Sequence, residues 1–196
     1  IDKALIRHRA CLEADPEIGN ESLLNEISEY ENLVPAWYVT TNGFEGSWDP
    51  VEVVDRMLNL KISAAWTTLG GRDAQLSLEP WSAGKLLGAL EANRIPLLLS
   101  YSDVPFDSLH QVLEHYPDLK VILIDQFRFG RDPVVYSLME QHESLNLSIN
   151  GKYTVHLGIE TLCQNFGYER ILFGCGYPSI EGGSSLANLS YADISE

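Results

Sequence analysis

The sequence predicts an α/β protein in which helices cover a parallel sheet. Short apolar or β-branched runs alternate with longer amphipathic stretches along the 196 residues. Several of the runs are continuously apolar, which is typical of strands buried on both faces. Strands that alternate with helices form right-handed βαβ units. Two architectures satisfy this pattern, a doubly wound open sheet and a (β/α)8 barrel.

Seven segments have the composition of strands, and VILID at 121–125 is the clearest of them. The predicted strands are residues 4–8, 33–41, 62–68, 95–101, 121–125, 145–149 and 171–174. No GxGxxG follows the first strand, and no phosphate-binding GxxxxGK loop occurs in the chain. Both absences weigh against the nucleotide-binding form of the open sheet. Seven strands are one fewer than a closed (β/α)8 barrel requires.

Each strand is followed by a segment with helical spacing of its apolar residues or by a helix start. Asn20 is the expected cap of the first helix, and Asp49-Pro50 combines a cap with a proline at the first helical position. The predicted helices are residues 20–31, 50–58, 85–92, 107–115, 133–142 and 155–166. The glycine pair within Ile180–Ser185 predicts a loop after the last strand.

Composition excludes several classes of protein. The chain has 28 acidic and 13 basic side chains and a formal net charge of -15, which argues against nucleic acid and anionic membranes as partners. The hydrophobic share of 45% is that of a globular protein, and the length predicts a single domain over residues 1–196. Three widely spaced cysteines without a CxxC pair favour a reducing, cytoplasmic location.

The segment YERILFGCGYP at 168–178 resembles the end of strand 8 in the amidohydrolase-related TIM-barrel family, where the pattern is E-R-[IL]-L-F-G-[ST]-D-[YF]-P. Four more segments resemble that family in the same order: IDKAL at 1–5, GN at 19–20, LVPAW at 33–37 and HYPDLKV at 115–121. The resemblance implies that the seven strands are barrel strands 2 to 8. It also implies a chain cropped at both ends, with strand 1 before Ile1 and a final helix from about Ala192 past Glu196.

The resemblance carries an expectation about chemistry. Members of the family are metal-dependent hydrolases or decarboxylases of small molecules, with the site at the C-terminal ends of the strands. A divalent metal such as zinc is held there by histidines of strands 1, 5 and 6 and by an Asp that ends strand 8. In this alignment Gly176 stands at the Asp position, strand 5 ends in Ser100-Tyr101, and strand 6 ends in Asp125-Gln126. The resemblance therefore implies a lost or atypical metal site, and no residue is assigned as a metal ligand.

The polar and aromatic residues at the strand ends are the candidate site. Asp125 and His8 are the candidate catalytic residues, although a buried structural acid and a structural histidine are the alternatives for them. The candidate pocket residues are Tyr38, Trp66, Ser100, Tyr101, Gln126, Asn150 and Gly176. Cys175 is expected to face the helices, because alternation along the strand turns it away from the side of Gly176. His110, His115 and His142 are predicted to face solvent on helices.

Three functions stay open. The first is an amidohydrolase-like barrel that binds a small molecule and has lost the metal site. The second is an active hydrolase that uses ligands from strand 1 together with Asp125 and His8. The third is a non-catalytic barrel that binds a small molecule. In each of them the partner is a small molecule, neither nucleic acid nor a membrane, and a homo-oligomer is compatible with all three.

Overall fold

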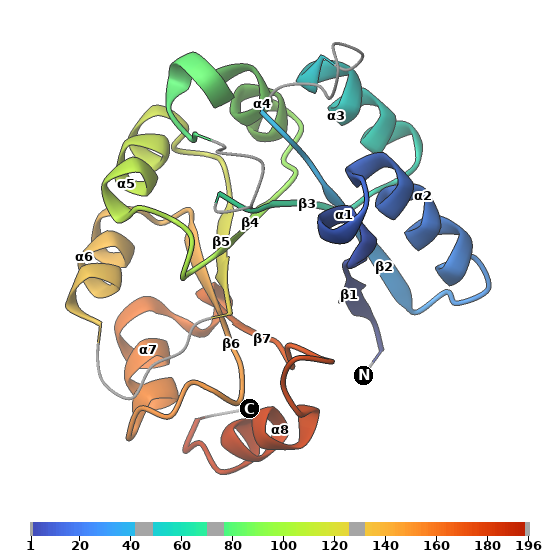
Figure 1. Ribbon diagram of the computed structural model, residues 1–196. Helices are drawn as coiled ribbons and strands as arrows, with labels where there is room; N and C mark the ends of the chain where they lie inside the picture. Colours follow the sequence, from blue (N-terminus) through green and yellow to red (C-terminus); the bar gives the residue numbers. More distant parts are fainter. Residues whose placement is uncertain (1, 42–48, 70–76, 126–131, 195–196) are drawn as a thin grey trace. The chain divides into compact units, whose positions relative to one another are not determined.

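The computed structural model describes residues 2–41, 49–69, 77–125 and 132–194. The chain forms two compact units, Ile1–Leu98 and Leu99–Glu196, and the boundary falls within a strand. Each unit alternates strands with helices (Figure 1). In each unit the strands follow one another across the sheet in chain order.

The first unit is a parallel sheet with helices on its outer face. Ala36 of the second strand pairs with Ala64 of the third. The Ala65 N–H of the third strand donates to the carbonyl of Pro96 at 2.9 Å, and Pro96 directly precedes the fourth strand. Its elements are β1 (Ala4–Ile6), α1 (Ala10–Glu13), α2 (Pro16–Ile27), β2 (Leu33–Tyr38), α3 (Pro50–Asn59), β3 (Ala64–Thr67), α4 (Pro80–Ala92) and the start of β4 (Leu97–Ser100).

The second unit repeats the same alternation. Tyr101 N–H, just after β4, donates to the Ile124 carbonyl at 2.9 Å, and the strands that follow are parallel neighbours. Its further elements are α5 (Phe106–His115), β5 (Val121–Ile124), α6 (Pro133–Gln141), β6 (Leu145–Ile149), α7 (Gly158–Phe166), the 3-10 turn η2 (Tyr168–Arg170), β7 (Ile171–Phe173) and α8 (Gly182–Ser190). All seven predicted strands are therefore present, and the α/β class with parallel pairing is confirmed.

An aspartate followed by proline begins three of the helices. Asp15 and Asp132 each accept hydrogen bonds from two backbone N–H groups of the first turn, and Asp49 accepts from one. The proline after each occupies a position that needs no N–H donor. The predicted cap at Asn20 is wrong, because the helix begins one turn earlier at Pro16. Asn20 lies inside α2, where its buried amide bonds to the backbone of Tyr38.

The segment after β7 departs from the prediction. The glycine pair begins helix α8, and the expected helix near Ala192 is absent from residues 191–194, where the described chain is not helical. Close packing explains the difference. Ser185 is 2% exposed and its hydroxyl accepts a hydrogen bond from the Gly151 N–H at 2.8 Å. This contact stabilises a helix that local propensity alone disfavours.

The core of each unit is built from the buried faces of strands and helices. Trp37 and Met57 are buried in the first unit, and Leu123 and Leu147 in the second. Within the described ranges, none of the helices combines the length and the apolar composition that crossing a bilayer requires.

Candidate functional site

One face of the first unit carries an aromatic pair at the carboxyl ends of its strands. The register pairs Tyr38 with Trp66, so both side chains lie on the same face of the sheet. Their rings meet edge to face with centroids 4.7 Å apart. The neighbouring pair, Trp37 with Ala65, points to the opposite face, where helix α3 packs. Tyr38 and Trp66 therefore lie on the face turned away from helix α3, and their role as pocket residues stays a prediction.

Arg7 joins this aromatic pair. Leu5 of β1 pairs with Val34 of β2, and alternation along β2 puts Val34 on the same face as Tyr38. Arg7 lies two residues after Leu5, so it lies on this face as well. The Arg7 guanidinium carbon lies 5.1 Å from the centroid of the Trp66 ring, within the range of a cation–π interaction. The strand ends of the first unit thus present a cation against an aromatic wall.

Asn20 of helix α2 holds the end of β2 in place. Its amide group donates to the Tyr38 carbonyl and accepts from the Tyr38 N–H, each at 2.9 Å, so one side chain satisfies a whole peptide unit. The Tyr38 hydroxyl is 3.0 Å from the hydroxyl of Thr68. The Cys11 thiol donates to Asn20 at 3.5 Å, and burial raises the pKa of Cys11 to about 11. Cys11 therefore stays a neutral thiol in a structural role.

His8 lies apart from the aromatic face. Its Nδ1 accepts a hydrogen bond from the Ala10 N–H at 3.2 Å, and its Nε2 lies 3.3 Å from a carboxylate oxygen of Glu26 on helix α2. An Nδ1 that accepts requires the proton on Nε2, which then donates to Glu26. The structure thus brings His8 to α2 and does not bring it to Tyr38 and Trp66. This geometry supports the structural alternative for His8.

In the second unit Tyr101 is held by a buried carboxylate. Its hydroxyl donates to Asp132, which is 5% exposed and also accepts from the N–H groups of Val134 and Val135 at the start of α6. The Tyr101 ring packs edge to face on Phe106, with centroids 5.5 Å apart. Tyr101 is therefore fixed in orientation at the end of β4. The neighbouring Ser100 hydroxyl pairs with that of Ser102 at 3.0 Å.

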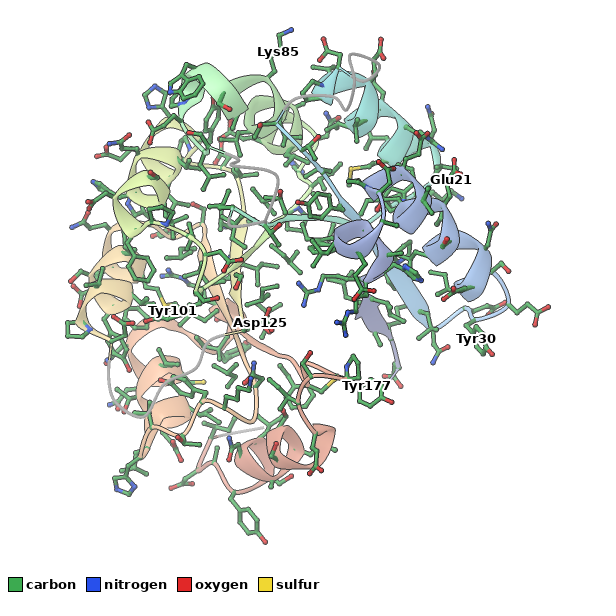
Figure 2. All side chains as sticks on the ribbon, viewed as in Figure 1. Glu21, Tyr30, Lys85, Tyr101, Asp125 and Tyr177 are labelled. Carbon is green, nitrogen blue, oxygen red and sulfur yellow. The ribbon has the colours of Figure 1, made fainter. Side chains whose placement is uncertain are left out.

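Asp125 ends β5 in an unusual backbone conformation. Its φ is +59°, in the left-handed region, and its side chain is exposed. Aspartate tolerates this region better than most residues, and such conformations concentrate at turns and at functional sites. Since Tyr101 N–H donates to the carbonyl of Ile124, the ends of β4 and β5 are adjacent, and Figure 2 shows Tyr101 and Asp125 from these two ends. Gln126 lies outside the described residues.

Asn150 serves the loop after β6. It is 6% exposed, and its side-chain oxygen accepts from the Lys152 N–H at 2.8 Å, which closes a turn of the Asx type. Alternation places Asn150 on the face of Ser148, and that face also includes Gly174 of the next strand, since a Cβ on Gly174 would meet the Ser148 hydroxyl at 2.6 Å. The Asn150 side chain is thus committed to its own turn.

Gly176 occupies a position that disfavours any side chain. Its φ is +65°, and a Cβ there would lie 2.7 Å from the Cδ1 atom of Ile180. The Ile180 N–H donates to the Gly176 carbonyl at 3.0 Å and closes the turn after β7. Cys175 lies near α8, because a Cβ on Gly182 would be 3.8 Å from the Cβ of Cys175. The predicted alternation, with Cys175 toward a helix, agrees with this contact.

The predicted surface histidines differ from expectation. His115 is exposed, but His110 and His142 are partly buried and joined by a 2.8 Å hydrogen bond between His110 Nδ1 and His142 Nε2. Both side chains keep part of their solvent exposure, but the prediction did not include their contact with each other. They sit on α5 and at the end of α6, and amphipathic spacing alone does not reveal that two helices place their histidines in contact.

Two of the candidate strand-end residues, Gly176 and His8, do not fit a divalent metal of the kind that the resemblance implies. Gly176 offers no ligand atom, and the ring nitrogens of His8 are used by Ala10 and Glu26. Across the ranges that the structure describes, no group of three or more His, Cys, Asp or Glu side chains has the arrangement of a metal site. No chemical step is therefore assigned to a metal held by these residues.

Sequence reasoning missed two residues of the site. Arg7 was included only as part of a strand, although its position two residues after Leu5 predicts the face it occupies. Asp132 was overlooked, although Asp132-Pro133 has the same form as Asp49-Pro50, which was recognised as a helix start. Its bond to Tyr101 depends on tertiary packing and has no local signal.

Comparison with known proteins now places the fold. No family model matches the chain, and neither does any curated protein. Solved structures do match. An uncharacterised TIM-barrel protein from Bordetella bronchiseptica has a TM-score of 0.71 and 17% identity over 100% of this chain and 72% of its own. The 5-carboxyvanillate decarboxylase of Sphingomonas paucimobilis has a TM-score of 0.67 and 11% identity, covering 98% of this chain and 73% of its own.

A third solved structure supports the same assignment. A putative amidohydrolase from Staphylococcus aureus has a TM-score of 0.61 and 15% identity over 95% of this chain and 76% of its own. The fold is that of a TIM barrel, of which the described chain forms seven parallel strands. At these identities the likeness establishes the fold of the barrel and leaves its activity to the residues at the strand ends.

Proposed function

We propose that this protein is an amidohydrolase-type TIM barrel that binds a small molecule at its strand ends and has lost the metal site of that barrel type. The observation that carries the proposal is Gly176. In the resemblance it stands where a metal-binding Asp is expected, and its φ of +65° together with the contact to Ile180 opposes any side chain there. The site keeps aromatic and polar side chains at the strand ends, which is where such barrels bind ligands.

Equilibrium dialysis against zinc and against manganese, followed by elemental analysis, tests the loss of the metal site. We expect less than one tightly held ion per chain, with no dependence on Asp125→Asn. A stoichiometric ion bound by three or more protein ligands contradicts the proposal. Gly176→Asp serves as a probe of the position itself, because the new carboxylate restores the ligand type that the resemblance calls for.

A second candidate function keeps catalysis, and the conformation of Asp125 favours it. A non-glycine residue with φ of +59° at a strand end has a backbone conformation that occurs at turns and at active sites. This candidate predicts hydrolysis of small amide or ester substrates that falls at least about a hundredfold in Asp125→Asn. The matched control is Asp118→Asn, an exposed acid at the loop before β5. Equal activity of both variants and the unaltered chain excludes a catalytic Asp125.

The proposal extends to the binding partner, the location and the oligomeric state of the protein. The partner is a small molecule, with neither nucleic acid nor a membrane surface involved, since 28 acidic residues face only 13 basic ones. A cytoplasmic location and a homo-oligomer are compatible with this function.

A further inference from the structure

A pair of histidines joins helices α5 and α6 of the second unit. His110 lies within α5 and His142 directly follows α6, and His110 Nδ1 is 2.8 Å from His142 Nε2. The ring centroids are 5.0 Å apart, with an angle of 57° between the ring planes. Strand β6 begins shortly after His142, at Leu145, so the pair lies toward the amino end of that strand. It is therefore separate from the candidate site at the carboxyl ends of the strands.

The backbone at both histidines is held by hydrogen bonds. The His142 N–H donates to the Leu138 carbonyl at 2.9 Å, and the His142 carbonyl accepts from the Leu145 N–H at 3.2 Å. The same carbonyl accepts from the Arg170 guanidinium at 2.8 Å. His110 is an interior residue of α5, where the hydrogen bonds of the helix hold its backbone. Only side-chain rotation is left to either ring, so the two imidazoles keep a defined separation.

A carboxylate beside His110 favours one tautomer of its ring. An oxygen of Glu114, one helical turn further along α5, lies 3.6 Å from His110 Nε2. A proton on Nε2 faces this carboxylate, and Nδ1, which meets His142, is then an unprotonated acceptor. Histidines that bind metals are commonly oriented in this way, with a carboxylate at the nitrogen that does not bind the metal. The tautomer that Glu114 favours thus leaves a lone pair of His110 directed at the second ring.

The separation of the two nitrogens matches neighbouring ligand positions around a transition-metal ion. Imidazole nitrogens bind such ions at about 2.0–2.1 Å, so two of them at a right angle are about 2.9 Å apart, and at the tetrahedral angle about 3.3 Å. The observed 2.8 Å is close to the right angle of tetragonal sites, which Cu²⁺ and Ni²⁺ prefer. Rotation about the side-chain bonds, which is soft for histidine rings, directs both lone pairs at one ion.

The surroundings of the pair suit a cation that keeps water ligands. A groove of about 220 Å³ between α5 and α6 is lined by His110 and Asp107, so water reaches the ring. Asp107, one turn before His110, and Glu143, next to His142, are both exposed carboxylates. The cation nearby is Arg170, whose guanidinium donates to backbone carbonyl groups. Waters on a bound ion would therefore find carboxylate acceptors close by.

We propose that His110 Nδ1 and His142 Nε2 bind one divalent transition-metal ion of the class that prefers nitrogen ligands, represented by Ni²⁺ and Cu²⁺. The ion takes the place of the proton between the two nitrogens, which moves to Nδ1 of His142, and water occupies the other coordination positions. Only two protein ligands take part, in agreement with the absence of a three-ligand group from the ranges that the structure describes. The inference is independent of the proposed function at the strand ends.

Isothermal titration calorimetry of the tag-free chain with nickel chloride tests this site. We expect one Ni²⁺ per chain, and binding that is at least about tenfold weaker in His110→Gln and in His142→Gln. His115→Gln is the matched control, because it removes an exposed histidine at the end of α5, and it should keep the full affinity. Glu114→Gln should weaken binding less than the loss of either ring, since Glu114 only orients His110. Magnesium, which prefers oxygen ligands, should not compete.

Nuclear magnetic resonance of the unaltered chain gives a measurement that needs no folded variant. Ni²⁺ is paramagnetic, so substoichiometric Ni²⁺ should broaden the ring signals of two of the five histidines before the others. Simultaneous broadening of all histidine signals overturns the site, because it shows that the ion visits surface histidines without preference.

Three results of the calorimetry also overturn the proposal. Full affinity in both His110→Gln and His142→Gln places the ion on other groups. An equal loss in His115→Gln shows binding that any surface histidine supports. No binding up to about 1 mM Ni²⁺ shows that the two rings form an ordinary hydrogen bond that no ion displaces. Thermal unfolding without metal checks that each variant is folded, and the resonance measurement decides where a variant is not.

Discussion

Gly176 shows how a single backbone angle limits the chemistry of a strand end. Non-glycine residues in the left-handed region lose about 1–2 kcal/mol relative to glycine, and the Ile180 side chain must also shift to admit a Cβ. An aspartate at this position would have to displace the Ile180 side chain before it could serve as a ligand. The turn after β7 is built for a residue without a side chain.

Gly176→Ala should lower the free energy of unfolding by about 1–2 kcal/mol because of its φ of +65°. Gly183→Ala is the matched control, since position 183 lies in helix α8 and a Cβ there meets nothing within 4 Å. The control should be neutral or stabilising by up to about 1 kcal/mol. Urea denaturation measures both variants. Equal stability of the two would show that the turn after β7 relaxes without strain.

At the scale of secondary-structure elements, the Asp132 carboxylate accepts hydrogen bonds from both a helix start and a strand end. It caps helix α6 through the N–H groups of Val134 and Val135, and it accepts the Tyr101 hydroxyl from the end of β4. The residue that caps α6 therefore also fixes the side chain of Tyr101, a candidate pocket residue at the end of β4.

Asp132→Ala should destabilise the protein by about 2–4 kcal/mol, from the lost cap and the lost acceptor of Tyr101. Asp15→Ala is the matched control, because Asp15 caps α2 through the same pattern of two backbone N–H groups and has no such tyrosine partner in the described structure. The control should cost about 1 kcal/mol. Chemical denaturation compares them. Equal losses would mean that the bond to Tyr101 adds nothing to stability.

The histidine pair between α5 and α6 makes stability depend on pH. Burial, followed by the charge of His110, lowers the pKa of His142, while Glu114 acts in the opposite direction. The folded state thus binds a proton at His142 less readily than the unfolded state, whose pKa is about 6.5. Stability is therefore greatest above that value and falls as the pH decreases through it.

Denaturation between pH 7.5 and pH 5 tests this dependence. The free energy of unfolding should fall with decreasing pH, and His142→Gln should make the fall shallower. His115→Gln is the control, because His115 is exposed at the end of α5. A pH profile that both substitutions leave unchanged would exclude His142 as the cause.

At the scale of the whole molecule, the charge of -15 dominates the electrostatics. The labelled side chains Glu21 and Lys85 point outward from α2 and α4 (Figure 2), and Lys85 pairs with Asp49 at 3.4 Å with a side chain that is 74% exposed. Exposed pairs of this kind contribute little. Repulsion among the excess acidic groups is the larger effect, and salt screens it.

Raising sodium chloride from about 0.01 M to about 0.15 M, which shortens the Debye length from about 30 Å to about 8 Å, should therefore increase the Tm by a few degrees. Differential scanning calorimetry at fixed pH measures the change. A lower Tm at the higher salt concentration would instead show that ion pairs such as Arg56 with Glu17 and Glu21 outweigh the repulsion.

The fold could be predicted from the sequence because strand periodicity and Asp-Pro helix starts are local signals. All seven strands follow from apolar runs, and the resemblance carried by the segment YERILFGCGYP predicted a TIM barrel. The cap at Asn20 was predicted incorrectly, because the Asn20 amide pairs with the Tyr38 peptide, which is a tertiary contact. The loop predicted in place of helix α8 was also incorrect, because Ser185 packs on Gly151, which is again a tertiary contact. For the candidate site, the sequence named Tyr38 and Trp66 as pocket residues, which stays a prediction. That these two share a face and that Arg7 lies against Trp66 required the register of the strands.

Gly151 limits which substitutions homologous sequences can accept at position 151. A Cβ at that position would collide with the Ser184 hydroxyl, and its N–H already donates to Ser185. A lineage that gains a side chain at position 151 must also remodel the α8 segment, so the two places should change together across homologous sequences. An alignment in which residue 151 varies freely beside an unaltered Ser184-Ser185 would contradict this expected covariation.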